Sequence, residues 1–279
     1  MSAALTSTTN AACATCGLYN HAQLRKLGIN TDDCDYVVAL AGNPNTGKST
    51  IFNALTGLRQ HVGNWPGKTV SRAEGGFVYG GSKFKLVDLP GTYSLLSTSA
   101  DEEIARDFIL FGQPTVTVVV VDATRLERNL NLALQILEIT DRVVVALNLM
   151  DEADRHGISV DARHLSKRLG VPVVPMAARQ RQGVPELLEA VAQVAAGAYV
   201  PRPHRIHYRD PQLERAVNEL AAQIEAEFPG LPNARWVALR LLDGDASIEQ
   251  AVRDRTLGDL ARELAPAVAA PVAVLEAAS

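Results

Sequence analysis

The stretch Gly42–Ser49, GNPNTGKS, decides the fold of this 279-residue chain. It follows the short apolar run Tyr36–Ala41, YVVALA, and precedes Lys48–Leu55, in which apolar residues recur at helical spacing. Glycines let backbone N–H groups wrap around phosphate oxygens, and the positive end of a following helix dipole favours the same anion. A strand, a G-x-x-x-x-G-K-S loop and a helix therefore predict a phosphate-binding loop.

The residue types in this loop suit a nucleotide with its magnesium ion. The Lys48 ammonium can reach the β- and γ-phosphates, and the Ser49 hydroxyl can bind Mg²⁺. We expect contacts to the nucleotide from most of the loop, namely from Gly42, Asn43, Asn45, Thr46, Gly47, Lys48, Ser49 and Thr50.

A second motif, Asp88-Leu-Pro-Gly91, ends another apolar run about forty residues later. The Asp88 carboxylate would face the phosphate loop across a neighbouring strand and hold Mg²⁺, and the Gly91 N–H would approach the γ-phosphate. By itself this motif is an ordinary turn. After a phosphate loop it predicts the second part of the same site.

A third motif, Asn148-Leu-Met-Asp151, selects the base. A carboxylate at Asp151 can accept hydrogen bonds from guanine N1–H and N2–H₂, whereas adenine has the opposite polarity there. Asn148 would bond the N7/O6 edge, with Met150 beside it and backbone N–H groups of Ala177 and Ala178 near O6. The alternative is a strand end at Asn148 and a helix cap at Asp151. The three motifs in this order predict a guanine nucleotide.

Strand and helix patterns alternate along residues 35–200, which predicts an α/β fold of the Ras-like phosphate-loop class. The expected sheet has six strands, mostly parallel, with a hairpin at Gly80-Gly81 and a loop over residues 58–70. Residues 201–267 follow a stiff Pro201-Arg-Pro203 boundary and predict a small all-helical domain. We expect a weakly structured extension at residues 1–34 and a tail at residues 268–279.

Composition excludes several classes of protein. The net charge is −4 and the pI is about 5.9, so nucleic acid is not an expected partner. No apolar run approaches the roughly 18 residues of a membrane-spanning helix, and residues 1–10 lack the features of a secretory signal. Three cysteines fit a reducing compartment. The sequence predicts a cytosolic location.

The cysteines pose a separate question. Cys13-x-x-Cys16, with His21 and Cys34, supplies the ligand types of a tetrahedral metal site. Their spacing is loose, and free thiols in an extension are the alternative that we favour. The spacing of these residues therefore does not decide whether the N-terminal region binds a metal.

The three motifs, with VGNWPGKTV at residues 62–70 and DLPGTYS at residues 88–94, resemble the cytosolic N-terminal part of the FeoB ferrous-iron transporters. The resemblance covers Val37 to about Val194, and the helical region follows by position. It implies GTP binding and slow hydrolysis that regulates ferrous-iron transport at the cytoplasmic face of a bacterial inner membrane. The implied partner is a membrane-spanning part of the same polypeptide, and a homo-oligomer is compatible with it.

The resemblance also assigns the switches and the role of the helical region. Thr69 would close on Mg²⁺ and the γ-phosphate, and residues 58–70 and 89–100 would be the two switch loops. The loop context of Trp65 predicts a mobile or partner-facing side chain. Residues 204–265 would slow GDP release.

Two positions bear on the catalytic mechanism. Thr92 follows Gly91 where Ras-like enzymes place a glutamine, so unaided hydrolysis should be slow. In the resembled family, Asn45 and the carbonyls of Gly63 and Trp65 would bind K⁺, which supplies positive charge beside the phosphates. The alternative is that Asn45 serves only the geometry of its own turn. We predict catalytic roles for Asn45, Lys48, Thr69 and Gly91.

Two departures from the usual motifs, Leu149 in place of lysine and Ala177-Ala178-Arg179 in the last loop, suggest rapid nucleotide exchange. The rival interpretation is an assembly or RNA-modification GTPase acting on a cytosolic complex, which would need a basic surface that the composition does not provide. An ATPase or kinase does not fit Asn148 and Asp151.

Overall fold

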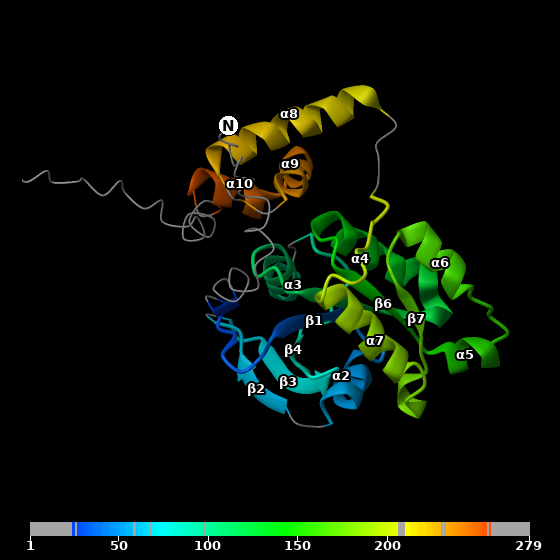
Figure 1. Ribbon diagram of the computed structural model, residues 1–279. Coiled ribbons are helices and arrows are strands. Elements are labelled where there is room, and N and C mark those ends of the chain that lie inside the picture. The colour runs from blue at the N-terminus through cyan, green and yellow to red at the C-terminus, as the bar shows by residue number, and fades with distance from the viewer. Residues whose placement is uncertain are drawn as a thin grey trace, which may run out of the picture. The chain divides into compact units, whose positions relative to one another are not determined.

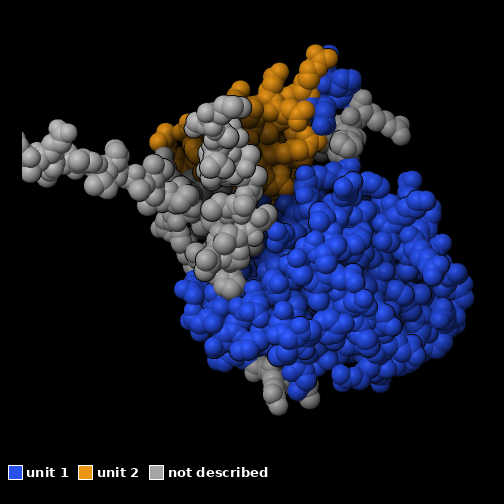
Figure 2. Space-filling view, viewed as in Figure 1, with its two compact units in different colours: residues 1–214 blue, residues 215–279 orange. Residues whose placement is uncertain are grey.

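The computed structural model describes residues 24–25, 27–57, 60–66, 68–96, 99–205, 210–229, 231, 233–255 and 257. Its contacts divide the chain into two compact units, Met1–Glu214 and Arg215–Ser279 (Figure 2). The first unit is built around one sheet, and the described part of the second consists of helices and turns.

The sheet of the first unit has the strand order β2-β3-β4-β1-β5-β6-β7 (Figure 1). Its strands are β1 Tyr36–Gly42, β2 Gln60–Asn64, β3 Ser71–Tyr79, β4 Ser82–Asp88, β5 Val116–Asp122, β6 Val143–Asn148 and β7 Val173–Pro175. The five strands from β4 to β7 in this order run parallel, while β2 and β3 are antiparallel additions. The α/β class with a mostly parallel sheet is confirmed, but the predicted number of six strands is wrong.

The extra strand is β2, which lies within the segment expected to be a loop. Its sequence, QHVGN, has neither an apolar run nor alternation, so its own residues give no strand pattern. It forms because it pairs antiparallel with β3, with Val62 opposite Ala73, and it remains at the edge of the sheet with Val62 exposed. Pairing with a distant segment outweighs local propensity here.

The helices of the first unit cover both faces of the sheet. They are α2 Lys48–Thr56, α3 Ala100–Leu110, α4 Leu126–Ile139, α5 Met150–Arg155, α6 Ala162–Leu169 and α7 Val184–Ala195. Helices α2 and α7 pack on one face and α4, with α3 beside it, on the other (Figure 1). Every residue of β5 and β6 is buried, as expected of parallel strands covered on both sides.

The hairpin between β3 and β4 forms at the predicted place. Gly80 and Gly81 both have positive φ, 58° and 84°, which is the backbone of the two-residue turn that suits twisted strands. This turn pairs Tyr79 with Ser82 and thereby sets the register up to Ala73 opposite Asp88.

The second unit contains α9 Ala234–Leu242 and α10 Ala246–Arg253, and α8 Pro211–Glu227 begins four residues before its boundary. Its buried side chains include Ile224, Trp236 and Val237. Residues 258–267 of the expected all-helical region lie outside the described residues. Over the parts of the chain that the structure describes, no helix is both long and apolar enough to cross a membrane.

Candidate nucleotide-binding site

The predicted motifs meet at the carboxyl ends of the parallel strands, where α/β sheets place their ligand sites. Residues 43–47 connect β1 to α2, Asp88 ends β4 and Asn148 ends β6. The Cα atom of Pro44 lies 3.5 Å from the position that a Cβ atom on Gly91 would occupy. The first two motifs are therefore in contact along this edge of the sheet.

The phosphate loop is formed by residues that tolerate unusual backbone angles. Asn45 and Gly47 have φ values of 66° and 84°, a region that asparagine and glycine enter at least cost. The Thr46 hydroxyl donates to the Asn43 carbonyl at 2.9 Å. The side-chain amide of Asn43 is buried with neither its nitrogen nor its oxygen hydrogen-bonded, so the loop has polar capacity that its own structure does not use.

Lys48 begins α2 and extends toward β4. Its ammonium forms an ion pair with the Asp88 carboxylate and donates to the Leu89 carbonyl at 2.7 Å. Burial raises the pKa of Asp88, and the positive charge of Lys48 opposes that shift. Helix α2 has no side-chain cap, so its first N–H groups are available to an anion together with Lys48. Ser49 and Thr50 are exposed at the same helix end.

Asn148 connects two loops that are distant in sequence. Its amide nitrogen donates to the Thr46 carbonyl at 2.9 Å, and its amide oxygen accepts from the Ala178 N–H at 3.0 Å. The residue is 1% exposed. A Cβ atom on Gly47 would lie 2.3 Å from the Asn148 amide, so only glycine fits there. Asn148 thus fixes the phosphate loop to the loop after β7.

The expected contact between guanine O6 and the last loop stays a prediction, and in this structure the two backbone N–H groups concerned have other partners. The Ala178 N–H is engaged by Asn148, and the Ala177 N–H donates to the Gln182 carbonyl at 3.2 Å. Both alanines are buried. The Ala178 backbone N–H therefore positions Asn148.

Asp151 lies in the first turn of α5, whose N-cap residue is Leu149, so Asp151 is not the helix cap of the alternative interpretation. Leu149, at φ 63°, directs the chain into this helix, and the Met150 N–H donates to the Met176 carbonyl at 3.0 Å. The Asp151 carboxylate is 22% exposed and accepts from Gln180 at 3.2 Å. The sequence did not predict the contact of Gln180 with Asp151, because nothing in the sequence around Gln180 indicates it.

Trp65 contradicts the expectation of a mobile or partner-facing side chain. It is 4% exposed, and its ring meets Phe108 of α3 edge-on at a centroid distance of 5.4 Å. The Arg72 guanidinium lies 5.4 Å from the same ring. A large aromatic ring gains more from burial than a polar loop side chain does, and the β2–β3 pairing directs Trp65 to the sheet.

The remaining switch residues lie in a closed turn. The Trp65 N–H donates to the Val70 carbonyl, and the Lys68 N–H donates to the Trp65 carbonyl, each at 3.0 Å. Thr69 is exposed within this turn, and Gly63 is paired with Arg72 inside β2. The Trp65 carbonyl expected to bind K⁺ is thus engaged by its own turn.

The segment after Gly91 is partly anchored. The Thr92 N–H donates to the Gly42 carbonyl at 3.4 Å, and the Thr92 side chain is buried. Tyr93 is exposed, with the Arg128 guanidinium 4.4 Å from its ring centroid. Neither residue supplies a side-chain amide beside Gly91.

Of the candidate ligands of the N-terminal tetrahedral site, only Cys34 lies within the described residues. Its thiol donates to the Thr31 carbonyl at 3.6 Å, and burial raises its pKa, which disfavours the thiolate that metals bind. Among the residues that the structure describes, no group of three or more His, Cys, Asp or Glu side chains could hold a metal. The hypothesis involving Cys13, Cys16 and His21 stays a prediction.

The chain resembles known proteins over both units. The family model for ferrous iron transport protein B matches residues 36–191, and that for the FeoB cytosolic helical domain matches residues 210–277. The Fe(2+) transporter FeoB of Escherichia coli (strain K12) is 44% identical over 212 residues, which are 75% of this chain and 27% of the relative. The chain spans between 15% and 27% of the length of the curated relatives it matches.

Solved structures agree with that assignment. The cytosolic domain of L. pneumophila FeoB is 37% identical with a TM-score of 0.72, and the match covers 80% of this chain and 88% of that one. The cytosolic domain of the T. maritima FeoB iron transporter in GDP form I is 38% identical with a TM-score of 0.72, over 80% and 85% of the two chains. The chain belongs to the ferrous iron transport protein B family.

Proposed function

We propose that this chain binds GTP and GDP, hydrolyses GTP slowly, and acts as the cytosolic regulatory part of a ferrous-iron transporter. The observation that carries the proposal is the Asn148 side chain, which joins the phosphate loop to the loop after β7. Lys48 follows two residues after the bonded Thr46 and Asp151 three residues after Asn148, so a cation for the phosphates and a carboxylate for the base belong to the two joined segments. The GDP form of the T. maritima relative supports the same ligand class.

The base preference follows from the polarity of Asp151. An ionised carboxylate only accepts hydrogen bonds, and guanine offers two donors on its N1/N2 edge. Adenine has an acceptor at N1, which would face the carboxylate and leave it unpaired. A site of this kind rejects the wrong base strongly because its own polar groups lose their partners.

Hydrolysis would depend on charge beside the phosphates. Lys48 would leave Asp88 for the β- and γ-phosphates, which frees that carboxylate for Mg²⁺ together with Ser49 and Thr69. When bound, the Mg²⁺ ion would neutralise developing negative charge on the transferred group. With no glutamine after Gly91 to orient water, we expect slow turnover.

We further propose that K⁺ stimulates hydrolysis through Asn45. The Asn45 side chain is exposed at the loop, but its φ of 66° also supports the alternative, a residue chosen for its backbone. The K⁺ role would require the turn at Trp65 to open, since that carbonyl accepts from Lys68 in this structure.

The test separates the role of the Asn45 side chain from the role of its backbone conformation. Asn45→Gly keeps a residue suited to positive φ while removing the amide, whereas Asn45→Ala would add strain. We expect GTP hydrolysis by the native chain to be about tenfold faster or more in K⁺ than in Na⁺, and Asn45→Gly to lose that difference. Equal rates in both salts for the native chain would reject the K⁺ role, and absence of any GDP binding would reject the nucleotide site.

The place of the chain in a longer protein is also a proposal. The curated relatives are Fe(2+) transporters several times longer than the matched region. We propose that the nucleotide state changes the helical unit, which acts on a membrane-spanning part of the same polypeptide at the cytoplasmic face of the bacterial inner membrane. Co-expression of this chain with that part, followed by GTP-dependent Fe²⁺ uptake, would test this role.

A further inference from the structure

A segment before the matched family region packs against the first unit. Residues 24–25 and 27–33, hereafter the strap, precede residue 36, at which the family model begins. Leu24, Ile29 and Thr31 of the strap are each at most 2% exposed. A segment buried to this degree is part of the folded core and not a loose extension.

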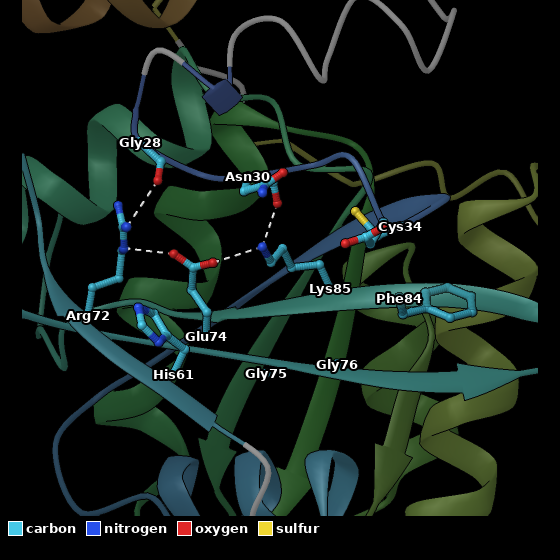
Figure 3. Close-up of a pocket in the computed structure, with 11 residues that line it drawn as sticks. Gly28, Asn30, Cys34, His61, Arg72, Glu74, Gly75, Gly76, Phe84 and Lys85 are labelled. Atoms are coloured by element: carbon cyan, nitrogen blue, oxygen red, sulfur yellow. Dashed lines mark hydrogen bonds and ion pairs between the residues drawn. The ribbon is translucent and has the colours of Figure 1, made fainter.

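Two cationic residues of the β3–β4 hairpin, Arg72 and Lys85, hold the strap by its carbonyl groups. Arg72 donates to the Gly28 carbonyl at 3.0 Å, and Lys85 donates to that of Asn30 at 2.5 Å (Figure 3). Arg72 also donates to the Leu27 carbonyl at 3.2 Å. Buried Glu74 lies between the two cations, 2.9 Å from Arg72 and 3.0 Å from Lys85. The carboxylate sets the position of both donors, so the three residues form one clamp.

The strap also contacts the first switch loop directly. A Cβ atom on Gly28 would lie 2.9 Å from Cγ of Pro66, and Gly28 has a φ of 79°. The same guanidinium that holds Gly28 faces the buried Trp65 ring. The strap therefore contacts Pro66 directly and is connected to Trp65 through Arg72.

The strap and Trp65 share helix α3 as a support. A Cβ atom on Gly112, just after α3, would lie 2.9 Å from Leu27 and 3.3 Å from Leu24. One helical turn earlier, Phe108 packs on Trp65. The same helix end thus receives apolar side chains from both segments, and loss of either one would loosen the other.

We propose that the strap is a latch that holds Trp65 and Pro66 in this buried arrangement and competes with bound triphosphate for the first switch loop. This inference rests on the proposed function, because the competitor is the Thr69 contact to Mg²⁺ and the γ-phosphate. Thr69 lies inside the turn that the Trp65 and Val70 backbone closes. Drawing Thr69 to the nucleotide opens that turn and removes Trp65 from beside Arg72. By linkage, strap docking and triphosphate binding weaken each other by the same factor.

The first experiment observes Trp65 without nucleotide. In a Trp236→Phe background Trp65 is the only tryptophan, so its emission and acrylamide quenching report its burial. Gly28→Val places a side chain against Pro66 and should make Trp65 emission shift to the red and become readily quenched. Gly197→Val is the matched control, since Gly197 also has a positive φ but has no neighbour within 4 Å of its Cβ position.

A second variant tests the same claim in case Gly28→Val fails to fold. Lys85→Met removes the tether to Asn30 but leaves the Arg72–Glu74 pair in place, and we expect the same change in quenching with an unaltered circular dichroism spectrum. Trp65 emission and quenching unchanged in both folded variants would overturn the latch.

The second experiment compares two nucleotides on the same proteins. Gly28→Val and Lys85→Met should bind a non-hydrolysable GTP analogue about fivefold more tightly or better than the native chain, with GDP affinity unchanged. If Trp65 became exposed in these variants but the ratio of their affinities for the GTP analogue and for GDP stayed the same, the proposed competition between strap and triphosphate would be overturned. Failure of the native chain to bind either nucleotide would overturn the proposed function and the competition with it, while the quenching result would still decide the latch.

Discussion

The two sides of the nucleotide site are stabilised in different ways. On the base side, Asn148 is buried at the end of the interior parallel strand β6 and joins two loops through backbone groups. On the switch side, β2 is an edge strand, and its loop is held by one buried ring, Trp65, and by side chains of Arg72 and Lys68. The base side is held by hydrogen bonds of one buried side chain to two loops, whereas loss of a few side-chain contacts would release the switch side.

This difference explains how one sheet can both recognise a base and change conformation with the phosphate state of the nucleotide. Hydrogen bonds within the base side are made before any ligand arrives, which favours a fixed geometry and specificity. On the switch side, the closed turn at Trp65 is one of two conformations that a triphosphate could select. Variants on each side should therefore differ in what they do to nucleotide binding: base-side variants should change GDP affinity and the choice of base, and switch-side variants should change the preference between GTP and GDP.

The largest effect is expected at Trp65. Trp65→Ala removes a buried ring and should lower the free energy of unfolding of the first unit by about 3–5 kcal/mol, as large aromatic deletions in cores do. Urea unfolding followed by circular dichroism measures it, with Trp65→Phe as the milder control. A change below about 0.5 kcal/mol, the scale of exposed positions, would restore the view of a mobile side chain.

A smaller loss is expected on the base side. Asn148→Ala leaves the Thr46 carbonyl and Ala178 N–H unpaired, which should cost about 1–3 kcal/mol of stability and also weaken GDP binding. Asn129→Ala is a matched control, since Asn129 is also buried but bonds one backbone group, the Arg125 carbonyl. If both variants bound GDP as the native chain does, Asn148 would have no part in the site.

The smallest effect concerns the helical unit. We expect deletion of residues 204–265 to speed GDP release by about fivefold, at the low end of typical coupling between sites. Stopped-flow release of a fluorescent GDP analogue measures it, and circular dichroism checks that the remaining part is folded. Identical release rates would remove the inhibitory role of this region.

Sequence patterns predicted the parts of the fold that depend on local residues. The apolar run at residues 36–41 predicts the strand β1, and the helical spacing of apolar residues at 48–55 predicts α2. Gly80-Gly81 predicts the hairpin and thereby its register. That register already places Lys85 diagonally opposite Glu74, so this pair was open to prediction.

The features that the sequence did not predict depend on contacts between residues that are distant in sequence. Strand β2 depends on β3, and the burial of Trp65 depends on Phe108, some forty residues away. The carbonyls that Arg72 and Lys85 hold belong to a segment without strand or helix periodicity. Motif spacing predicted where Asn148 would lie but not that its amide would bond the Thr46 carbonyl.

The central claim is that Asp151 reads a guanine edge, and one exchange of base and residue tests it most directly. Asp151→Asn replaces one carboxylate acceptor with an amide donor, which suits the O2 acceptor of xanthine in place of the N2 donor of guanine. Titration calorimetry with GDP and XDP should show the native chain preferring GDP and Asp151→Asn preferring XDP. Unchanged preference for GDP in Asp151→Asn, or native binding of ADP as tight as GDP, would contradict the account.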